Sequence, residues 1–254
     1  MTLFGLIGYP LGHSHSPAYF AQKFKAEKII DHEYRLFPLR GIEELPALLS
    51  AHPDLRGFNV TIPYKKTILP FLDWLTPEAR SIGAVNTVAV VRNGEKIQLL
   101  GHNTDATAFA VTLKRLLGEN RPHALVLGTG GAAHAVIFAL RQLNLEFMVV
   151  SRVKKDSQTL TYDELTPDIL SNHFLIIQCT PLGMSPLEDA CPALPYEAIT
   201  PNHILYDLIY NPEETLFLKK GKKKKATLVN GLEMLHLQAE MSWEFWRNPS
   251  FRLP

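Results

Sequence analysis

The residues Val126–Ala133 read VLGTGGAA, and this short segment constrains the fold more than any other part of the chain. An apolar run precedes the glycines, and a helix-like run, Ala132–Leu143, follows them. Gly128, Gly130 and Ala133 fit the spacing G-x-G-x-x-A, in which the first glycine permits a tight turn and the second lets the backbone approach a pyrophosphate. The N-terminus of the helix would offer free N–H groups and a positive partial charge to phosphates. The segment therefore predicts the strand–turn–helix unit of a dinucleotide-binding domain.

The end of the next strand bears on which dinucleotide would bind. An NAD enzyme usually has an acidic residue about 20 residues after the glycines, where it bonds the ribose 2′-hydroxyl. Here Ser151 and Arg152 stand at that point, followed by Lys154 and Lys155. A guanidinium can hold a 2′-phosphate through two hydrogen bonds, whereas an acid would repel it. The sequence therefore favours NADP; the alternative is that these cations are ordinary loop charges.

Other apolar runs complete an α/β unit over residues 105–230. Strands are expected at Ala124–Leu127, Phe147–Val150, Phe174–Cys179 and Ile204–Leu208, and helices at Thr107–Leu117 and Ala132–Leu143. This alternation predicts a Rossmann-type sheet with helices packed on it. The lysine-rich run Lys219–Lys225 is interpreted as a solvated loop around Gly221 rather than an anion-binding site.

The first hundred residues show a similar alternation. Strands are expected at Leu3–Gly8, His32–Leu39 and Gly57–Val60, and helices at Ser16–Ala26, at Ile42–Ser50 and from Pro63 onward. This order predicts a second parallel sheet with helices on it. Asn93-Gly94 separates two further apolar runs, Thr87–Val91 and Lys96–Leu100, and such a dipeptide between two strands is a strong hairpin signal.

Near the C-terminus, apolar residues recur at spacings of three and four from Leu232 to Trp246. This spacing predicts a helix with one apolar face. The helix either ends the second unit or returns to the first. A chain of 254 residues is long enough for two modest domains, each with a core of its own.

Composition excludes several classes of protein. A formal net charge of +1 and a charged fraction of 20% indicate neither a nucleic-acid-binding surface nor an acidic tail. The two cysteines, Cys179 and Cys191, form no CxxC pair, and a disulfide framework is not expected at this size. No stretch approaches the roughly 20 apolar residues of a membrane span, and the N-terminus is too interrupted for a signal peptide. A cytoplasmic location is expected.

Several polar segments are richer in turns and short side chains than a plain fold needs. They are GYPLGHSHSP at Gly8–Pro17, GFNVTIPYK at Gly57–Lys65, IGAVNT at Ile82–Thr87, GHNTD at Gly101–Asp105, YDLIYNP at Tyr206–Pro212 and NGLEMLHLQ at Asn230–Gln238. Together with the glycine-rich turn, and in this order through nearly the whole chain, they resemble the shikimate dehydrogenase family.

The resemblance implies an NADP-dependent oxidoreductase that interconverts 3-dehydroshikimate and shikimate in chorismate and aromatic amino acid biosynthesis. It implies a substrate-binding and catalytic domain of residues 1–104 plus 231–254, an inserted Rossmann-type NADP domain of residues 105–230, and a C-terminal helix that returns to the first domain. The catalytic pair would be Lys65 and Asp105. Residues implied to bind substrate are Ser14, Ser16, Asn59, Thr61, Asn86, Tyr210 and Gln238. Residues implied to bind the cofactor are Gly128, Gly130, Gly131, Ala132, Ser151, Arg152 and Gly231.

Residue chemistry agrees with these roles. A small polyhydroxylated acid needs many short donors and acceptors, which Ser, Thr and Asn supply. Lys65 is expected in the first turn of the helix after Pro63, where the positive end of the helix is unfavourable to an ammonium, and Asp105 opens a helix, where the same end favours a carboxylate. Such a pair could relay a proton to a forming alkoxide. The pair His13-x-His15 lacks a third ligand, so no metal is expected.

Three residues depart from the family pattern. Glu233 adds a negative charge near the implied nicotinamide end, His236 replaces an apolar residue, and Val153 removes a hydroxyl beside the adenosine phosphate. One alternative is a quinate/shikimate dehydrogenase that accepts NAD. Others are a non-catalytic nucleotide-binding regulator and another two-domain NADP enzyme such as a folate dehydrogenase. A small-molecule substrate is expected as partner, without nucleic acid or membrane, in a monomer or homodimer.

Overall fold

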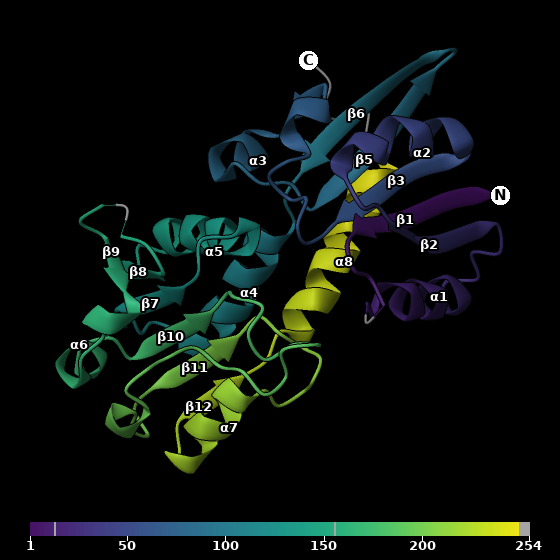
Figure 1. Cartoon of the computed structure of the whole chain (residues 1–254). Coiled ribbons are helices and arrows are strands. Elements are labelled where there is room, and N and C mark those ends of the chain that lie inside the picture. Colours follow the sequence, from purple (N-terminus) through teal and green to yellow (C-terminus); the bar gives the residue numbers. More distant parts are fainter. Residues whose placement is uncertain (13, 155, 249–254) are drawn as a thin grey trace. The chain divides into compact units, whose positions relative to one another are not determined.

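The computed structural model describes residues 1–12, 14–154 and 156–248. The chain forms two compact units: one comprises Met1–Thr104 and the described residues from His236 onward, and the other Asp105–Leu235. Within the described residues, each unit holds a six-stranded sheet (Figure 1). The predicted class, two α/β units with a C-terminal helix that returns to the first, is confirmed. The assignment of substrate to residues 1–104 plus 231–254 and of cofactor to 105–230 stays a prediction.

The first unit is a mixed sheet with the strand order β2-β1-β3-β5-β6-β4. Its strands are β1 (Thr2–Gly8), β2 (His32–Pro38), β3 (Leu55–Val60), β4 (Trp74–Leu75), β5 (Thr87–Asn93) and β6 (Lys96–His102). Its helices are α1 (Ser16–Ala26), α2 (Leu45–Ala51) and α3 (Pro77–Ile82), with 3₁₀ turns at Ile42–Glu44 and Leu69–Phe71. Strand β1 pairs with β2 and β3 in parallel, whereas β5 is antiparallel to both β3 and β6.

The parallel order expected of the first three strands is confirmed, and the predicted hairpin makes the whole sheet mixed. Strands β5 and β6 form a hairpin, as predicted, but Asn93 pairs with Lys96, so the two turn residues are Gly94 and Glu95. Gly94 has a φ of 61°, which suits the first central position of a tight hairpin turn. A two-residue turn can join only antiparallel strands, and this is why the sheet is mixed.

The prediction of a helix from Pro63 onward is wrong. Tyr64 N–H bonds to the Thr61 carbonyl and Ile68 N–H to the Tyr64 carbonyl, at 2.9 and 3.0 Å, so the segment consists of turns that end in the 3₁₀ turn Leu69–Phe71. Pro70 has no N–H to donate and disfavours the helical region for Leu69 before it, so a helix could not continue through this point. Lys65 consequently does not lie in the first turn of an α-helix, and the helix-dipole argument for its chemistry does not apply.

The second unit is a fully parallel sheet with the order β12-β11-β10-β7-β8-β9. Its strands are β7 (Ala124–Leu127), β8 (Phe147–Ser151), β9 (Thr159–Thr161), β10 (Leu175–Gln178), β11 (Ile204–Asp207) and β12 (Thr227–Val229). Its helices are α4 (Asp105–Leu117), α5 (Gly131–Gln142), α6 (Pro167–Ser171) and α7 (Leu216–Lys223), and α8 (Leu232–Arg247) begins in it. The chain leaves β7 towards β8 and β9 and then returns to β10 on the other side of β7. The strand order thus reverses between β7 and β10, where ligands bind in folds of this kind.

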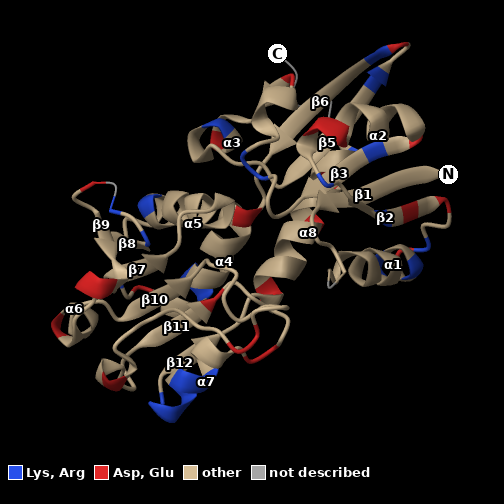
Figure 2. Cartoon of the chain, in the orientation of Figure 1, with Lys and Arg blue, Asp and Glu red and all other residues tan. Residues whose placement is uncertain are grey.

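Most of the lysine-rich run is helical, contrary to expectation, because α7 extends to Lys223; Lys224 and Lys225 lie in the turn after it. Gly221 is buried inside this helix, where a Cβ would lie 2.5 Å from Leu205 and 2.9 Å from Leu228. The glycine lets α7 approach the sheet closely instead of interrupting the helix. The lysines gather at the end of α7 in Figure 2.

Helix α8 begins in the second unit, and its residues from His236 onward belong to the first. There Trp246 stacks on Phe4 with ring centroids 4.9 Å apart and donates its indole N–H to the Val88 carbonyl at 2.9 Å. A Cβ on Gly57 would lie 2.4 Å from the Trp246 ring, so the glycine gives the indole room. These contacts fix the end of α8 against β1, β3 and β5 (Figure 1).

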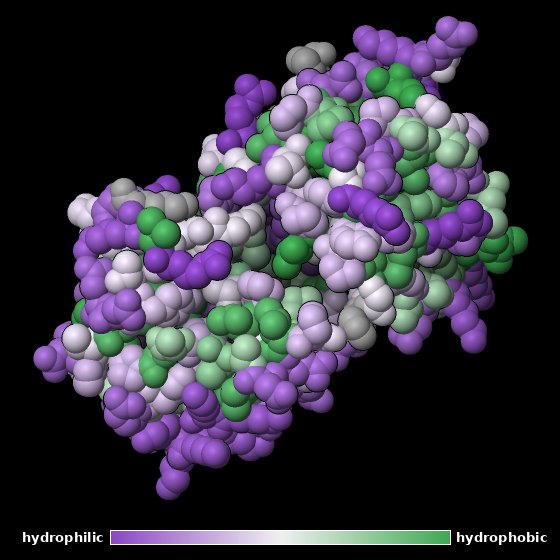
Figure 3. Space-filling view, in the orientation of Figure 1, coloured by the Kyte–Doolittle hydropathy of each residue, from purple (hydrophilic) through white to green (hydrophobic). Residues whose placement is uncertain are grey.

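The surface shows no broad apolar region on the face seen in Figure 3, where small apolar patches are separated by hydrophilic residues. In the described part of the chain, no helix has the length and apolar character needed to cross a membrane.

Candidate functional site

A buried polar cluster lies in the first unit around Asn59 of β3. The Asn59 side chain is 5% exposed. Its amide oxygen accepts a hydrogen bond from the Tyr34 hydroxyl at 2.9 Å, and its amide nitrogen donates to the Asn86 carbonyl at 3.1 Å and to Ser242 Oγ at 2.9 Å. Asn59 thereby ties β3 to the residue before β5 and to α8.

Asn86 extends the cluster towards α8. Its amide nitrogen donates to Thr104 Oγ1 at 2.8 Å and to Gln238 Oε1 at 3.3 Å, and its amide oxygen accepts the Thr104 backbone N–H at 2.8 Å. Three predicted substrate residues, Asn59, Asn86 and Gln238, therefore belong to one buried network. A network with its polar groups satisfied is rigid, so these side chains keep their orientation without a ligand.

Sequence reasoning missed four members of this network: Tyr34, Thr87, Thr104 and Ser242. Thr87 Oγ1 lies 2.8 Å from Ser242 Oγ, and the Ser242 hydroxyl donates to the Gln238 carbonyl at 2.8 Å. Ser242 follows Gln238 by four residues, which places both on one face of a helix. That spacing was the available signal for Ser242; no comparable signal marks Tyr34.

The predicted serines lie where α1 begins. Ser16 is the first residue of α1 and is 9% exposed, and Ser14 is half-buried. The Ser16 N–H donates to Ser14 Oγ at 3.3 Å. The N-terminus of an 11-residue helix favours an anion through its dipole. His13 of the same segment lies outside the described residues.

Thr61 and Lys65 follow β3 within the first unit. The Thr61 N–H donates to the Ile7 carbonyl at 2.9 Å, and the Lys65 carbonyl accepts the Val85 N–H at 2.7 Å. The backbone of both residues is therefore anchored, and both side chains are half-buried. Asp105, 5% exposed, is the first residue of α4, as expected, where a carboxylate is favourable.

The glycine-rich turn has the geometry of a phosphate cradle. Gly128 has a φ of 114°, which favours glycine, and its N–H donates to the Val150 carbonyl at 2.9 Å. A Cβ on Gly128 would lie 3.1 Å from Thr180, which follows β10. Gly130 precedes α5, and a Cβ built there would meet no atom within 4 Å, so the space beside it is open. Gly131 and Ala132 form the first turn of α5, whose N–H groups face this open side.

Ser151 ends β8 and is 8% exposed; Arg152 is exposed. Ser151 Oγ accepts the Val153 N–H at 3.3 Å. Across residues 1–12, 14–154 and 156–248, no carboxylate forms an ion pair with Arg152, whereas Lys154 pairs with Glu164. Arg152 is thus the cation in this segment with its donors available to a phosphate. Lys155 lies outside the described residues.

The loop after β11 carries Tyr210, which is half-buried. Gly231, just before α8, donates its N–H to the Ile209 carbonyl at 3.1 Å. A Cβ on Gly231 would lie 2.1 Å from the Leu208 carbonyl oxygen, so no other residue fits without a backbone shift. Gly231 therefore packs directly on the loop that carries Tyr210.

Asp207 holds the start of this loop, and sequence reasoning did not single it out. Its carboxyl is fully buried and accepts the Ile209 N–H at 3.0 Å and the Thr215 hydroxyl at 2.6 Å. Burial raises the pKa of Asp207 to about 7, against the opposing effect of these two hydrogen bonds. The position of the residue in YDLIYNP gave no sign that its carboxyl would be buried.

Two departures from the family pattern have partners within their own units. Glu233 Oε1 lies 2.6 Å from Arg115 Nη1 in an exposed ion pair, so its charge is balanced. The His236 ring stacks on Tyr19 with centroids 5.2 Å apart. Neither side chain is a lone charge or an isolated polar group.

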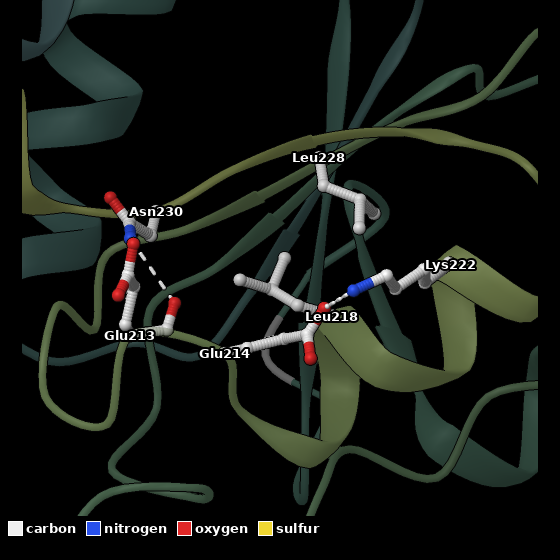
Figure 4. Close-up of a pocket in the computed structure, with 6 residues that line it drawn as sticks. All are labelled: Glu213, Glu214, Leu218, Lys222, Leu228 and Asn230. Carbon is white, nitrogen blue, oxygen red and sulfur yellow. Dashed lines mark hydrogen bonds and ion pairs between the residues drawn. The ribbon is translucent and has the colours of Figure 1, made fainter.

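An open hollow of about 360 Å³ in the second unit is not the predicted site. Figure 4 shows it beside α7, with Lys222 directed towards Glu214 and Asn230 bonded to the Glu213 carbonyl. None of its six lining residues is a predicted site residue. Over the residues that the structure describes, no group of three or more His, Cys, Asp or Glu is placed to hold a metal ion.

Known proteins resemble this chain over nearly its whole length. Residues 6–88 match the family described as shikimate dehydrogenase substrate binding domain. A shikimate dehydrogenase (NADP(+)) from Carboxydothermus hydrogenoformans is 39% identical over 98% of this chain and 92% of its own length. The crystal structure of shikimate 5-dehydrogenase from Thermus thermophilus, in complex with NADP(H) and shikimate, superposes with a TM-score of 0.82 at 33% identity over 100% of this chain and 95% of that one. Quinate dehydrogenase from Corynebacterium glutamicum, in complex with NAD, gives a TM-score of 0.82 at 26% identity over 96% and 93%.

Proposed function

The chain belongs to the shikimate dehydrogenase family, and we propose that it interconverts 3-dehydroshikimate and shikimate with NADP(H), a step of chorismate and aromatic amino acid biosynthesis. The observation that carries the proposal is the buried network around Asn59, Asn86 and Gln238 in a chain that matches NADP-dependent relatives end to end. The network holds amides and hydroxyls in place at the polar positions that the sequence picked out. A small polyhydroxylated acid is the ligand that such a site suits.

The second unit fits a dinucleotide. The left-handed backbone at Gly128, the open space beside Gly130 and the N-terminus of α5 together offer a cradle for a pyrophosphate at the switch point of the sheet. Gly131 and Ala132 would donate backbone N–H groups there. When bound, NADPH supplies the hydride for reduction of the ketone.

Arg152 supports NADP over NAD. The guanidinium is exposed, follows Ser151 at the end of β8 and lacks a carboxylate partner among the described side chains. A 2′-phosphate would satisfy its donors through charge-assisted bonds, which a ribose hydroxyl cannot match. The competing possibility is that the chain oxidises quinate with NAD. The related structure from Corynebacterium glutamicum is named a quinate dehydrogenase in complex with NAD, and the assay below distinguishes the two possibilities.

The substrate would be held by side chains of the first unit. Ser14 and Ser16, at the positive end of α1, would receive its carboxylate. Thr61, Asn86 and Gln238 would bond its hydroxyls, and the buried network fixes the last two in advance of binding.

The proton for the reduced oxygen would come from Lys65. The Val85 N–H bonds to the Lys65 carbonyl, so the Lys65 backbone is held in place and only the side chain moves the ammonium. Lys65 Nζ would donate a proton to the alkoxide oxygen as the hydride arrives, and the Asp105 carboxylate would keep the lysine charged between turnovers. In the reverse direction Lys65 would accept the proton of the shikimate hydroxyl.

An absorbance assay of NADP reduction by shikimate tests the proposal. Turnover with shikimate and NADP is expected, with NAD and quinate far less effective. Lys65→Ala should lower kcat by about 10²–10⁴-fold with a small change in KM for shikimate. Lys66→Ala, the neighbouring exposed lysine, is the control and should retain activity. Faster turnover of quinate with NAD would favour the quinate reading, and binding without turnover would favour a regulator.

We also propose a cytoplasmic location and small molecules as the only partners that the proposed reaction needs. No disulfide joins Cys179 and Cys191, which suits a reducing compartment. The choice between monomer and homodimer stays a prediction.

A further inference from the structure

Helix α8 uses two different polar faces within the first unit. Gln238 and Ser242, four residues apart, face the buried network. His236, Glu240 and Trp243, at spacings of four and three, face α1. The helix therefore links the buried network around Asn59 and Asn86 to α1, whose first turn carries Ser16.

Four side chains join α1 to α8, and we name them the α1–α8 clasp: Tyr19, Lys23, His236 and Glu240. Lys23 Nζ lies 2.6 Å from Glu240 Oε2, and the Tyr19 hydroxyl donates to the other carboxylate oxygen. The His236 ring stacks on the Tyr19 ring at an interplanar angle of 24°. One carboxylate on α8 thus receives two donors from consecutive turns of α1.

The clasp differs from an isolated surface ion pair, because Glu240 receives donors from both Lys23 and Tyr19 although its own side chain is 44% exposed. The Lys23 side chain is only 9% exposed, so solvent screens its charge weakly. The bonds from Lys23 and Tyr19 hold the pKa of Glu240 below its usual value although burial acts in the opposite direction. Glu240 is therefore a carboxylate at neutral pH, and Lys23 is its cation.

The hydrogen bonds and the ion pair of the clasp are directional, unlike the apolar contacts beside it. Phe24 and Trp243 pack beside it with ring centroids 5.4 Å apart, and this apolar contact holds the helices together without a bond of defined direction. Hydrogen bonds and a charge pair weaken steeply when geometry changes. The axial register of α1 against α8 is consequently set at the clasp.

The clasp lies next to the proposed substrate residues on both helices. Tyr19 follows Ser16 by three residues on α1, and Gln238 lies between His236 and Glu240 on α8. A shift of one helix along the other changes the distance between the serine hydroxyls and the Gln238 amide. A substrate bonded to both elements is sensitive to that distance, because small misplacements of binding groups weaken productive binding.

We propose that Glu240, bonded to Lys23 and Tyr19, is a positioning residue for the substrate: it sets the register of α1 against α8 and thereby the spacing between the serines and Gln238. The proposal rests on the proposed function, because it takes these residues as the groups that hold the two ends of the substrate. His236 contributes by holding the Tyr19 ring in place.

The chain offers a closely matched control. Glu27 also pairs with Lys23, and its side chain is 43% exposed against 44% for Glu240. Glu27 follows Lys23 by four residues, directly after the last residue of α1, so its loss leaves the link between helices intact. Glu240→Gln and Glu27→Gln remove the same charge from the same lysine, but only the first cuts the clasp.

Steady-state kinetics give the first test. Glu240→Gln should raise KM for shikimate about tenfold, the loss of one bond to a charged group, with kcat changed little and KM for NADP unchanged. Glu27→Gln should behave like wild type. An analogue without the carboxylate cannot bridge the two helices, so its affinity should be insensitive to Glu240→Gln. Equal effects of the two variants, or equal loss for the analogue, would overturn the proposal.

Hydrogen exchange of backbone amides gives a second test that needs no substrate. Exchange near the start of α1 and around Gln238 should accelerate in Glu240→Gln and not in Glu27→Gln. Unchanged exchange would overturn the proposal even in an active enzyme. One outcome is that exchange accelerates in Glu240→Gln while wild type neither binds nor oxidises shikimate. In that case the proposed function has failed, and the role of the clasp in substrate binding fails with it. The effect of the clasp on the register of α1 against α8 would still hold. If Glu240→Gln does not fold, Tyr19→Phe replaces it. This variant removes one hydroxyl from the clasp and should change KM for shikimate and amide exchange in the same direction, by a smaller amount.

Discussion

Replacing Asp207 with asparagine tests how the loop after β11 is held. The Asp207 carboxyl accepts the Ile209 N–H and the Thr215 hydroxyl, and its residue is fully buried. Asparagine has the same shape, and its oxygen can still accept the Ile209 N–H while its amide donates to Thr215 Oγ1. The substitution therefore removes the titration of the group and keeps its packing.

The magnitude follows from the pKa of Asp207. Burial raises it from 3.8 to about 7, so between these values the folded chain keeps a proton that the unfolded chain has lost. The stability that this group contributes is fully present below pH about 4 and is lost as the pH rises through about 7. A change of this size corresponds to on the order of 4 kcal/mol at most.

Urea unfolding of wild type and Asp207→Asn at mildly acidic and mildly alkaline pH measures this effect. From pH 5 to pH 8 wild type should lose about 2–3 kcal/mol of unfolding free energy relative to the variant, because the loss runs at about 1.4 kcal/mol per pH unit until the folded carboxyl ionises near pH 7. Asp163→Asn, an exposed position in the same unit, is the control and should follow the wild-type pH dependence. Parallel pH curves for wild type and Asp207→Asn would refute the reasoning, because they would mean that the buried carboxyl titrates alike in the folded and unfolded chain.

Three further variants test the other parts of the site. Arg152→Ala should raise KM for NADP by roughly ten- to a hundredfold and leave KM for NAD nearly unchanged; equal losses with both would remove Arg152 from phosphate recognition. The double variant Ser14→Ala/Ser16→Ala should raise KM for shikimate strongly, at roughly 1.5–3 kcal/mol per bond, and an unchanged KM would place the carboxylate elsewhere. Gly231→Ala, whose Cβ would lie 2.1 Å from the Leu208 oxygen, should lower stability by about 1–3 kcal/mol in thermal unfolding; an unchanged melting temperature would show that the loop yields freely.

Elements with strong local signals could be predicted from the sequence. Helix α1 was expected at Ser16–Ala26 and β7 at Ala124–Leu127, and both have these bounds. Pro17 near the start of α1 and the glycines after β7 act within a few residues, so no tertiary information was needed. The family, the fold class and the parallel sheet of the second unit were confirmed for the same reason.

Elements decided by packing could not be predicted. Gly221 is typical of a loop, but it lies in α7 because the helix must approach Leu205 and Leu228 closely. Pro63 is typical of a helix start, but the residues after it form turns. For glycine the local preference against a helix is worth about 1 kcal/mol, which tertiary contacts readily exceed, and Pro63 permits a helix to start without requiring one.

The sequence predicted the residues proposed to contact ligands, but not the residues that hold them in place. The predicted residues came from a resemblance, and their roles stay predictions. Tyr34 and Ser242 lie outside the motifs that carry the resemblance, and Thr87 and Asp207 lie inside them without any sign of their supporting role. Asn59 and Ser242 are 183 residues apart in sequence, and a hydrogen bond across that separation depends on the completed fold.

The proposed substrate side and the proposed cofactor side are built by different means, and substitutions near each are expected to have different effects. On the substrate side the binding groups are side chains locked in one network, so exchanging a member such as Ser242 leaves buried donors without partners. On the cofactor side the groups are mainly backbone N–H donors around Gly128 and Gly130, so side chains nearby can vary as long as the glycines remain. Val153 is 67% exposed and Glu233 is balanced by Arg115, which is why these departures from the family pattern disturb neither the network nor the turn.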